Sequence, residues 1–86
     1  MEFVVYGPLR AATGGKHVAV AVAGDTVRDA VEALLAAHPR AEPHLLDPAG
    51  ALRPSVRVMR DGERVDLDAP CPPGATLSLF PAMQGG

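Results

Sequence analysis

The last two residues of the chain, Gly85 and Gly86, offer one reactive group, the carboxylate of Gly86. Glycine has no Cβ and adopts many backbone conformations, so two in succession can pass through a narrow channel into the active site of another protein. A carboxylate is a poor electrophile and must be activated, most simply by ATP-dependent adenylation. The acyl-adenylate can then accept sulfur to form a thiocarboxylate, or an amine to form an amide. The chain has no residues suited to adenylation, so we expect another protein to perform it.

Two apolar residues, Phe80 and Met83, lie beside this terminus in the sequence. An exposed aromatic residue next to a reactive group is a suitable anchor for a partner, because aromatic side chains carry much of the binding energy at interfaces. Packing of Phe80 at the edge of a sheet is an equal alternative, since isolated exposed apolar residues are ordinary. Lys16 is the only lysine and, with the α-amino group, the only amine that could itself be modified.

The cysteine and the histidines are better explained by structural roles than by catalysis or metal binding. Cys71 lies in a proline-rich loop and could be exposed, but no neighbouring basic residue would lower the pKa of its thiol. We therefore interpret it as an ordinary loop residue. Its distance along the chain from the three histidines matches no common zinc-binding spacing, so no metal site and no bound cofactor are expected.

Two basic motifs are also weak candidates. The segment Gly14-Gly15-Lys16 lacks the earlier glycine and the following Ser or Thr of a phosphate-binding loop, and it precedes a predicted strand rather than a helix. Four arginines near the third predicted strand could face an acidic partner or RNA. Neighbouring acidic residues and the absence of interleaved aromatic residues favour a solvated surface instead. These arginines are Arg53, Arg57, Arg60 and Arg64.

Composition limits the class of protein. The chain has 86 residues, a net charge of −2, one cysteine and 48% hydrophobic residues, which suits one small domain without an internal disulfide. The net charge argues against a dedicated nucleic-acid binder. We find neither a signal peptide nor an apolar stretch that could span a membrane, so a cytoplasmic location is expected.

Hydrophobic periodicity predicts the elements that must position the terminus. Alternation and β-branched residues indicate strands over 2–6, 16–23, 55–60, 63–65 and 75–81. The first two are expected to form a hairpin with a loop between them, and Asp61-Gly62 is a strong hairpin turn signal. In the last strand, Leu77 and Leu79 should point inward and Phe80 outward.

One helix is predicted over residues 26–38. Its apolar residues follow the spacing of one helical face: Val27, Ala30, Val31, Leu34 and Leu35. Thr26 suits the N-cap, with Asp29 as the second member of a capping box, but Asp25 also favours a helix start and leaves the exact cap open. Pro39 ends the helix. Residues 40–54 are expected to cross over as a loop with one short helical turn, whose leucines cover the edge of the core.

The order strand, strand, helix, strand, strand, strand predicts an α+β fold in which one main helix covers a mixed sheet of four or five strands. The last strand is expected beside the first, at the centre of the sheet. Residues 1–81 would then form the domain, and residues 82–86 a flexible tail that projects from it.

This element order, the Leu79-Phe80-Pro81 exit from the last strand and the terminal Gly85-Gly86 resemble the MoaD/ThiS family of ubiquitin-like β-grasp proteins. The resemblance covers essentially the whole chain and is nearest to small archaeal modifier proteins and MoaD-like sulfur carriers. It implies a non-enzymatic carrier or modifier. A ubiquitin-activating-type enzyme with bound ATP and zinc would adenylate Gly86.

The resemblance leaves the fate of Gly86 open. A thiocarboxylate would donate sulfur for molybdopterin, thiamine, thiolated tRNA or cysteine, through a sulfurtransferase or a molybdopterin-synthase large subunit. An isopeptide bond would attach the protein to target lysines, and both roles can coexist. The alternative from a different class is a β-grasp binding module that forms no conjugates.

Overall fold

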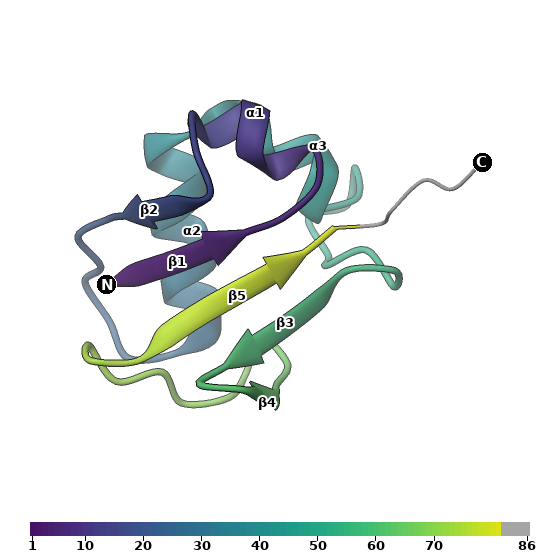
Figure 1. The fold of residues 1–86 in the computed structure, drawn as a ribbon. Coiled ribbons are helices and arrows are strands. Elements are labelled where there is room, and N and C mark those ends of the chain that lie inside the picture. The colour runs from purple at the N-terminus through teal and green to yellow at the C-terminus, as the bar shows by residue number, and fades with distance from the viewer. Residues whose placement is uncertain (82–86) are drawn as a thin grey trace.

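The computed structural model describes residues 1–81, which form a five-stranded mixed sheet with its helices packed mainly on one face (Figure 1). The strands run in the order β2-β1-β5-β3-β4 across the sheet. Their bounds are β1 Glu2–Val5, β2 His17–Ala19, β3 Arg57–Arg60, β4 Glu63–Arg64 and β5 Thr76–Phe80. The helices are α1 Leu9–Thr13, α2 Val27–Ala37 and α3 Glu42–Leu45, with a 3₁₀ turn at Pro39–Ala41. This arrangement confirms the predicted α+β, β-grasp fold.

The first and last strands lie side by side at the centre of the sheet. β1 and β5 pair in parallel, with Val5 opposite Leu79, while β1 pairs antiparallel with β2 and β5 antiparallel with β3. Leu77 and Leu79 of β5 are fully buried, as are Phe3 and Val5 of β1. The four side chains form the sheet half of the core, and the predicted inward and outward alternation is confirmed.

Helix α2 supplies the other half of the core. The five apolar residues of the predicted face are all buried, because their spacing places them on the side that meets the sheet. Thr26 accepts a hydrogen bond from the Asp29 N–H at 3.1 Å, and the Asp29 carboxylate accepts one from the Thr26 N–H at 3.3 Å. These hydrogen bonds hold the pKa of Asp29 below its ordinary value of 3.8. The predicted capping box is confirmed.

Gly24 fits tightly against this cap, which leads to a testable prediction. Its φ is +127°, and an added Cβ would overlap the Asp29 carboxylate. That carboxylate cannot move aside without breaking the capping box. Gly24→Ala should therefore lower the free energy of unfolding by about 2 kcal/mol, measured by urea denaturation.

Gly50→Ala is the matched control, because Gly50 also has a positive φ, +86°, but an added Cβ there meets nothing within 4 Å. It should cost about 1 kcal/mol for the backbone conformation alone. Equal losses in the two variants would contradict the role assigned to the contact with Asp29.

Two expectations about the first hairpin are corrected. The connection between the first two strands contains the helix α1 rather than only a loop, because Leu9 is fully buried and Gly14, at φ +85°, ends the helix. β2 is also shorter than predicted. The Val20 N–H still bonds to Met1 O at 3.0 Å, but the pairing of β1 with β2 ends at Glu2 and Ala19, so residues 21–23 lie outside the strand.

The other connections follow the sequence. Asp61 and Gly62 have φ values of +49° and +88°, which a two-residue β-hairpin turn requires, and they join β3 to β4 as predicted. Leu45 is fully buried in α3, so the crossover does contribute to the core edge. Within residues 1–81, no helix is long and apolar enough to cross a membrane.

Candidate functional site at the carboxyl end of the central strand

The strand β5 carries the chain to the predicted reactive terminus from the most strongly buried part of the sheet. Leu79 points into the core, Phe80 points to the face opposite α2, and Pro81 is buried. The point from which residues 82–86 continue is therefore fixed by core packing on one side of the sheet. Phe80, on the other face, is the half-buried side chain of β5 nearest that point.

Phe80 stacks on Tyr6, the residue that follows β1. The two ring centroids are 4.3 Å apart and the ring planes differ by 9°. The parallel register of β1 and β5 aligns these residues, and the Tyr6 N–H donates to Leu79 O at 3.2 Å. Both side chains are only half-buried, so the pair forms an apolar aromatic surface that is partly open to solvent.

Positive charge flanks this aromatic pair. Lys16 Nζ lies 5.0 Å from the centroid of the Tyr6 ring, a distance at which the ring quadrupole attracts the ammonium. The Val5 N–H bonds to Lys16 O at 2.8 Å and fixes the lysine backbone beside β1. On the other side, the register of β3 places the exposed Arg57 opposite Phe80. We call Lys16, Tyr6 and Phe80 the tail-root cluster.

The tail-root cluster is suited to binding. Its groups are two aromatic rings and an ammonium, which can hold a partner surface of complementary apolar and acidic character. Phe80, the member of the cluster nearest the terminus in sequence, directly precedes Pro81, where the described chain ends. The cluster can therefore orient a partner relative to the terminus, while the reacting carboxylate would be supplied by Gly86.

A protein-family model matches almost the whole chain. Residues 3–86 match the model of the ThiS family, so the matched region includes nearly all of the sheet and both terminal glycines. The chain belongs to the ThiS family.

Individual relatives place it more closely within that family. Small archaeal modifier protein 1 of Haloferax volcanii is 38% identical over 87 residues, and the match covers 100% of both chains. The crystal structure of that Haloferax volcanii protein superimposes with a TM-score of 0.91, covering 100% of this chain and 98% of the other. A chain of the Amycolatopsis orientalis BexX/CysO complex matches with a TM-score of 0.81 at 28% identity, covering 99% of this chain and 98% of the other.

Of the candidate residues of this ThiS-family chain, the structure brings Phe80 and Lys16 together through Tyr6. Gly86, Gly85 and Met83 lie outside the described residues, so their roles stay predictions. Tyr6 was missed at the sequence level. Its outward position after β1 and the parallel pairing of the first and last strands would together have indicated it.

The structure corrects the expectation that Cys71 could be exposed. Its side chain is almost fully buried, with Sγ 3.8 Å from Met1 Sδ, and burial raises the pKa of its thiol. The Cys71 N–H bonds to Asp25 O at 2.7 Å, which ties its loop to the start of α2. Cys71 therefore belongs to the core, whereas the sequence had indicated an ordinary loop residue.

The remaining titratable side chains that were considered as candidates do not lie together in one site. Among residues 1–81, no group of three or more His, Cys, Asp or Glu side chains could hold a metal ion. His17 lies 3.8 Å from the Glu2 carboxylate on the exposed sheet face, while His38 follows α2. The strand β2 follows Lys16, as the rejection of a phosphate-binding loop requires.

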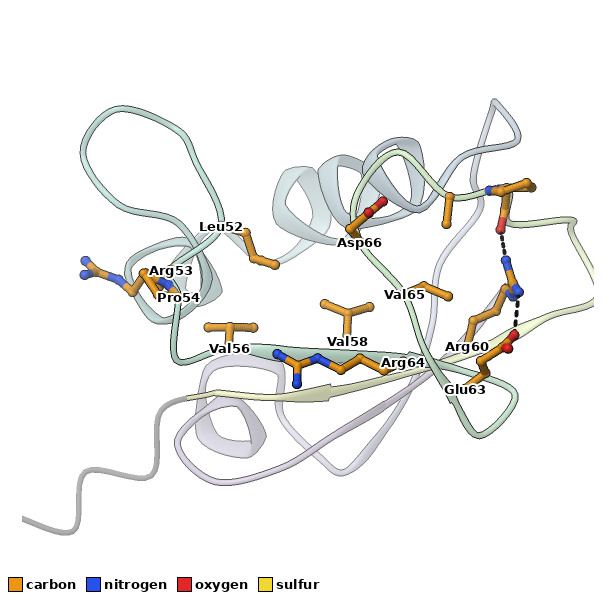
Figure 2. A pocket seen from close by; sticks show the side chains of 12 residues that line it. Leu52, Arg53, Pro54, Val56, Val58, Arg60, Glu63, Arg64, Val65 and Asp66 are labelled. Carbon is orange, nitrogen blue, oxygen red and sulfur yellow. Dashed lines mark hydrogen bonds and ion pairs between the residues drawn. The ribbon is translucent and has the colours of Figure 1, made fainter.

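The four arginines, for which a solvated surface was expected, are distributed over both faces of the sheet: Arg57 and Arg64 are exposed, and Arg53 and Arg60 are partly buried. Arg57 points to the open face of the sheet with Phe80, whereas Arg60 turns to the opposite side and bonds to Pro70 O and the Glu63 carboxylate. The alternation of side chains along β3 separates them, because successive residues of a strand point to opposite faces. Arg53 and Arg64 both line a groove beside β3 (Figure 2), and the register places Arg64 opposite Met59, on the face of Arg57 rather than that of Arg60.

Proposed function

We propose that this protein is a ubiquitin-like protein modifier, a sulfur carrier, or both, and that it acts through the carboxylate of Gly86. A ubiquitin-activating-type enzyme that binds ATP and zinc joins this carboxylate to AMP and releases pyrophosphate. A target lysine amine then displaces AMP to form an isopeptide bond. Alternatively, sulfide supplied by a sulfurtransferase displaces AMP to form a thiocarboxylate, which donates its sulfur for molybdopterin synthesis or tRNA thiolation.

The observation that carries this proposal is the full-length match to a small archaeal modifier protein, at 38% identity and without uncovered ends. The family match also extends through Gly86. The geometry supports it, because the last described part of the chain runs from the fully buried Leu79 to Phe80, a half-buried member of the aromatic pair. We further propose that the protein has no catalytic site of its own and can serve as the small subunit of a molybdopterin synthase-type complex.

Intact mass spectrometry of the protein purified from its own host tests the proposal. A fraction whose mass has increased by the exchange of one oxygen for sulfur would establish the thiocarboxylate. Gly-Gly remnants on lysines of other proteins would establish conjugation. If only the unmodified mass is found, and no adduct forms with an activating enzyme and ATP, the protein is better explained as a β-grasp binding module that does not conjugate.

Phe80 is proposed as a recognition residue for the activating enzyme. Phe80→Ala should reduce kcat/KM for adenylation about tenfold, mostly through a higher KM, because the stacked ring is removed from the partner's contact surface. A pyrophosphate-exchange assay measures the effect. Thr76→Ala is the control, since Thr76 lies on the same strand and face but at the opposite end of β5.

A melting curve must accompany this comparison, because loss of the ring pair should itself cost about 1 kcal/mol of stability. The recognition role fails if Phe80→Ala and Thr76→Ala are adenylated equally well at a temperature where both are folded.

Lys16 is proposed as the site of self-modification. The competing α-amino group donates to Val20 O at 2.9 Å and is held in the sheet, whereas Lys16 is exposed. Lys16→Arg keeps a cation over Tyr6 but removes the acylatable amine. Products in which one copy is joined to another should disappear on a denaturing gel, while conjugation to other proteins continues. Persistence of such products would assign the acceptor to the α-amino group.

A further inference from the structure

The only lysine of the chain lies inside the surface that the activating enzyme is proposed to contact. Lys16 Nζ is 5.0 Å from the centroid of the Tyr6 ring, and that ring stacks on Phe80 with the two centroids 4.3 Å apart. Phe80 directly precedes Pro81, from which the chain continues to Gly86. The tail-root cluster therefore contains both the proposed acceptor amine and the proposed recognition surface.

The backbone on both sides of Lys16 fixes the amine at this place. Gly14 ends α1 at φ +85°, and Thr13 Oγ1 donates a hydrogen bond to Gly15 O at 2.9 Å. The Val5 N–H then bonds to Lys16 O at 2.8 Å. Among residues 1–81, Lys16 Nζ forms no ion pair, and its side chain is exposed. The amine is therefore accessible to an acyl group, while the backbone beneath it is held beside β1.

Transfer of a second copy to Lys16 changes the charge of the cluster. Nζ loses one proton to solvent and attacks the carbonyl carbon of Gly86 in the acyl-adenylate of the second copy. A C–N bond forms, the C–O bond to the phosphate breaks, and AMP leaves with the electron pair of that bond. A second proton passes from the nitrogen to solvent. The product is a neutral amide, so the ammonium that the Tyr6 ring attracts is lost.

The same step also places a folded domain next to the aromatic pair. The second copy is joined to Nζ through its own residues 82–86, which span at most about 18 Å when fully extended. A domain of this length is itself about 30 Å across, so it stays close to the Tyr6 and Phe80 rings. Because the activating enzyme is proposed to contact Phe80, it requires the same space.

We propose that a copy carrying a second copy on Lys16 can no longer be activated at its own Gly86. This inference rests on the proposed function, because it concerns adenylation of the same terminus. Self-conjugation thus removes the acceptor copy from the pool of copies that can be transferred. Further copies can be added one at a time to a copy already attached to a target, but a linked pair is not transferred as a unit.

The test compares two linked pairs that differ only in the point of attachment. A lysine analogue with an azide group replaces either Lys16 or Glu32, and a second copy with an alkyne in place of the Gly86 carboxylate is coupled to it. Glu32 is exposed on α2, which packs on the other face of the sheet from the aromatic pair (Figure 1). The alkyne copy has no carboxylate to adenylate, so pyrophosphate exchange with the activating enzyme reports only on the acceptor copy.

Attachment at position 16 should lower kcat/KM for adenylation of the acceptor copy at least about tenfold relative to the unmodified protein, because the recognition surface is covered. Attachment at position 32 should lower it less than about twofold. Incorporation of acetyl-lysine at position 16 removes the ammonium without adding a domain, and should lower kcat/KM about threefold. Melting curves of all three proteins show that each comparison is made between folded domains.

The inference is overturned if the two linked pairs are adenylated equally well. It is also overturned if acetylation alone lowers kcat/KM as much as the linked copy does, because the attached domain would then not be the cause. Failure of the proposed function gives a different result, since the unmodified protein itself would not be adenylated. That result would overturn both.

Discussion

Deleting Gly85 and Gly86 should abolish both thiocarboxylate and isopeptide formation, while the melting temperature stays within about 2 °C of the parent protein. Within residues 1–81 the sheet and α2 already enclose a packed core that includes Phe3, Leu34 and Leu79, so we expect the domain to fold without the terminal glycines. The shortened chain would end at Gln84, whose side chain makes it wider and less conformationally free than glycine in a narrow active-site channel.

The measurement is intact mass and gel analysis after incubation with the activating enzyme, ATP and either a sulfur donor or target proteins. A Gln84→Ala variant with both glycines retained is the control, and it should remain active. Conjugation by the shortened chain would show that Gly86 is not the reacting group. Loss of folding would show instead that the terminus contributes to the core.

Leu79→Ala should have the largest effect on stability among the residues next to the terminus, a loss of about 2–5 kcal/mol. Leu79 is fully buried in the central strand, where it packs beside Val5 in the sheet half of the core. A domain of this length has a total stability of only about 4–13 kcal/mol, so such a loss is a large fraction of the whole.

Ser78→Ala is the matched control, because Ser78 is the adjacent residue but points to the open face. It should change the free energy of unfolding by less than about 0.5 kcal/mol in urea denaturation. The position of Pro81 depends on the packing of Leu79. The activity of Leu79→Ala should therefore decline over a wider range of temperature than the activity of the parent protein. Equal stabilities of the two variants would contradict the role of Leu79 in the core.

Local patterns were sufficient for the elements that a single segment can define. The apolar spacing of α2 and the capping pair Thr26 and Asp29 were readable because helix periodicity and capping depend on residues three or four apart. The hairpin at Asp61-Gly62 was readable because two adjacent residues must accept positive φ. Together with the order of strands, these features were enough to predict the fold class.

Features that depend on contacts between distant segments could not be predicted from local sequence patterns. β2 has fewer paired residues than its alternating valines suggest, because its register with β1 extends only from His17 to Ala19. Helix α1 forms around a buried Leu9 in a segment whose glycines and proline indicated only a loop. Cys71 is buried because its loop is tied to Asp25 at the start of α2, a contact between residues far apart in sequence.

The sequence by itself determined the helix, the tight turn, the fold class and the chemical character of the carboxyl terminus, all of which follow from neighbouring residues. Only the tertiary structure decided that Tyr6 stacks on Phe80 and that the arginines of one strand lie on two faces. The register between β1, β5 and β3 decides which side chains lie next to one another and on which face. That register arises from many side chains packing together rather than from any one segment.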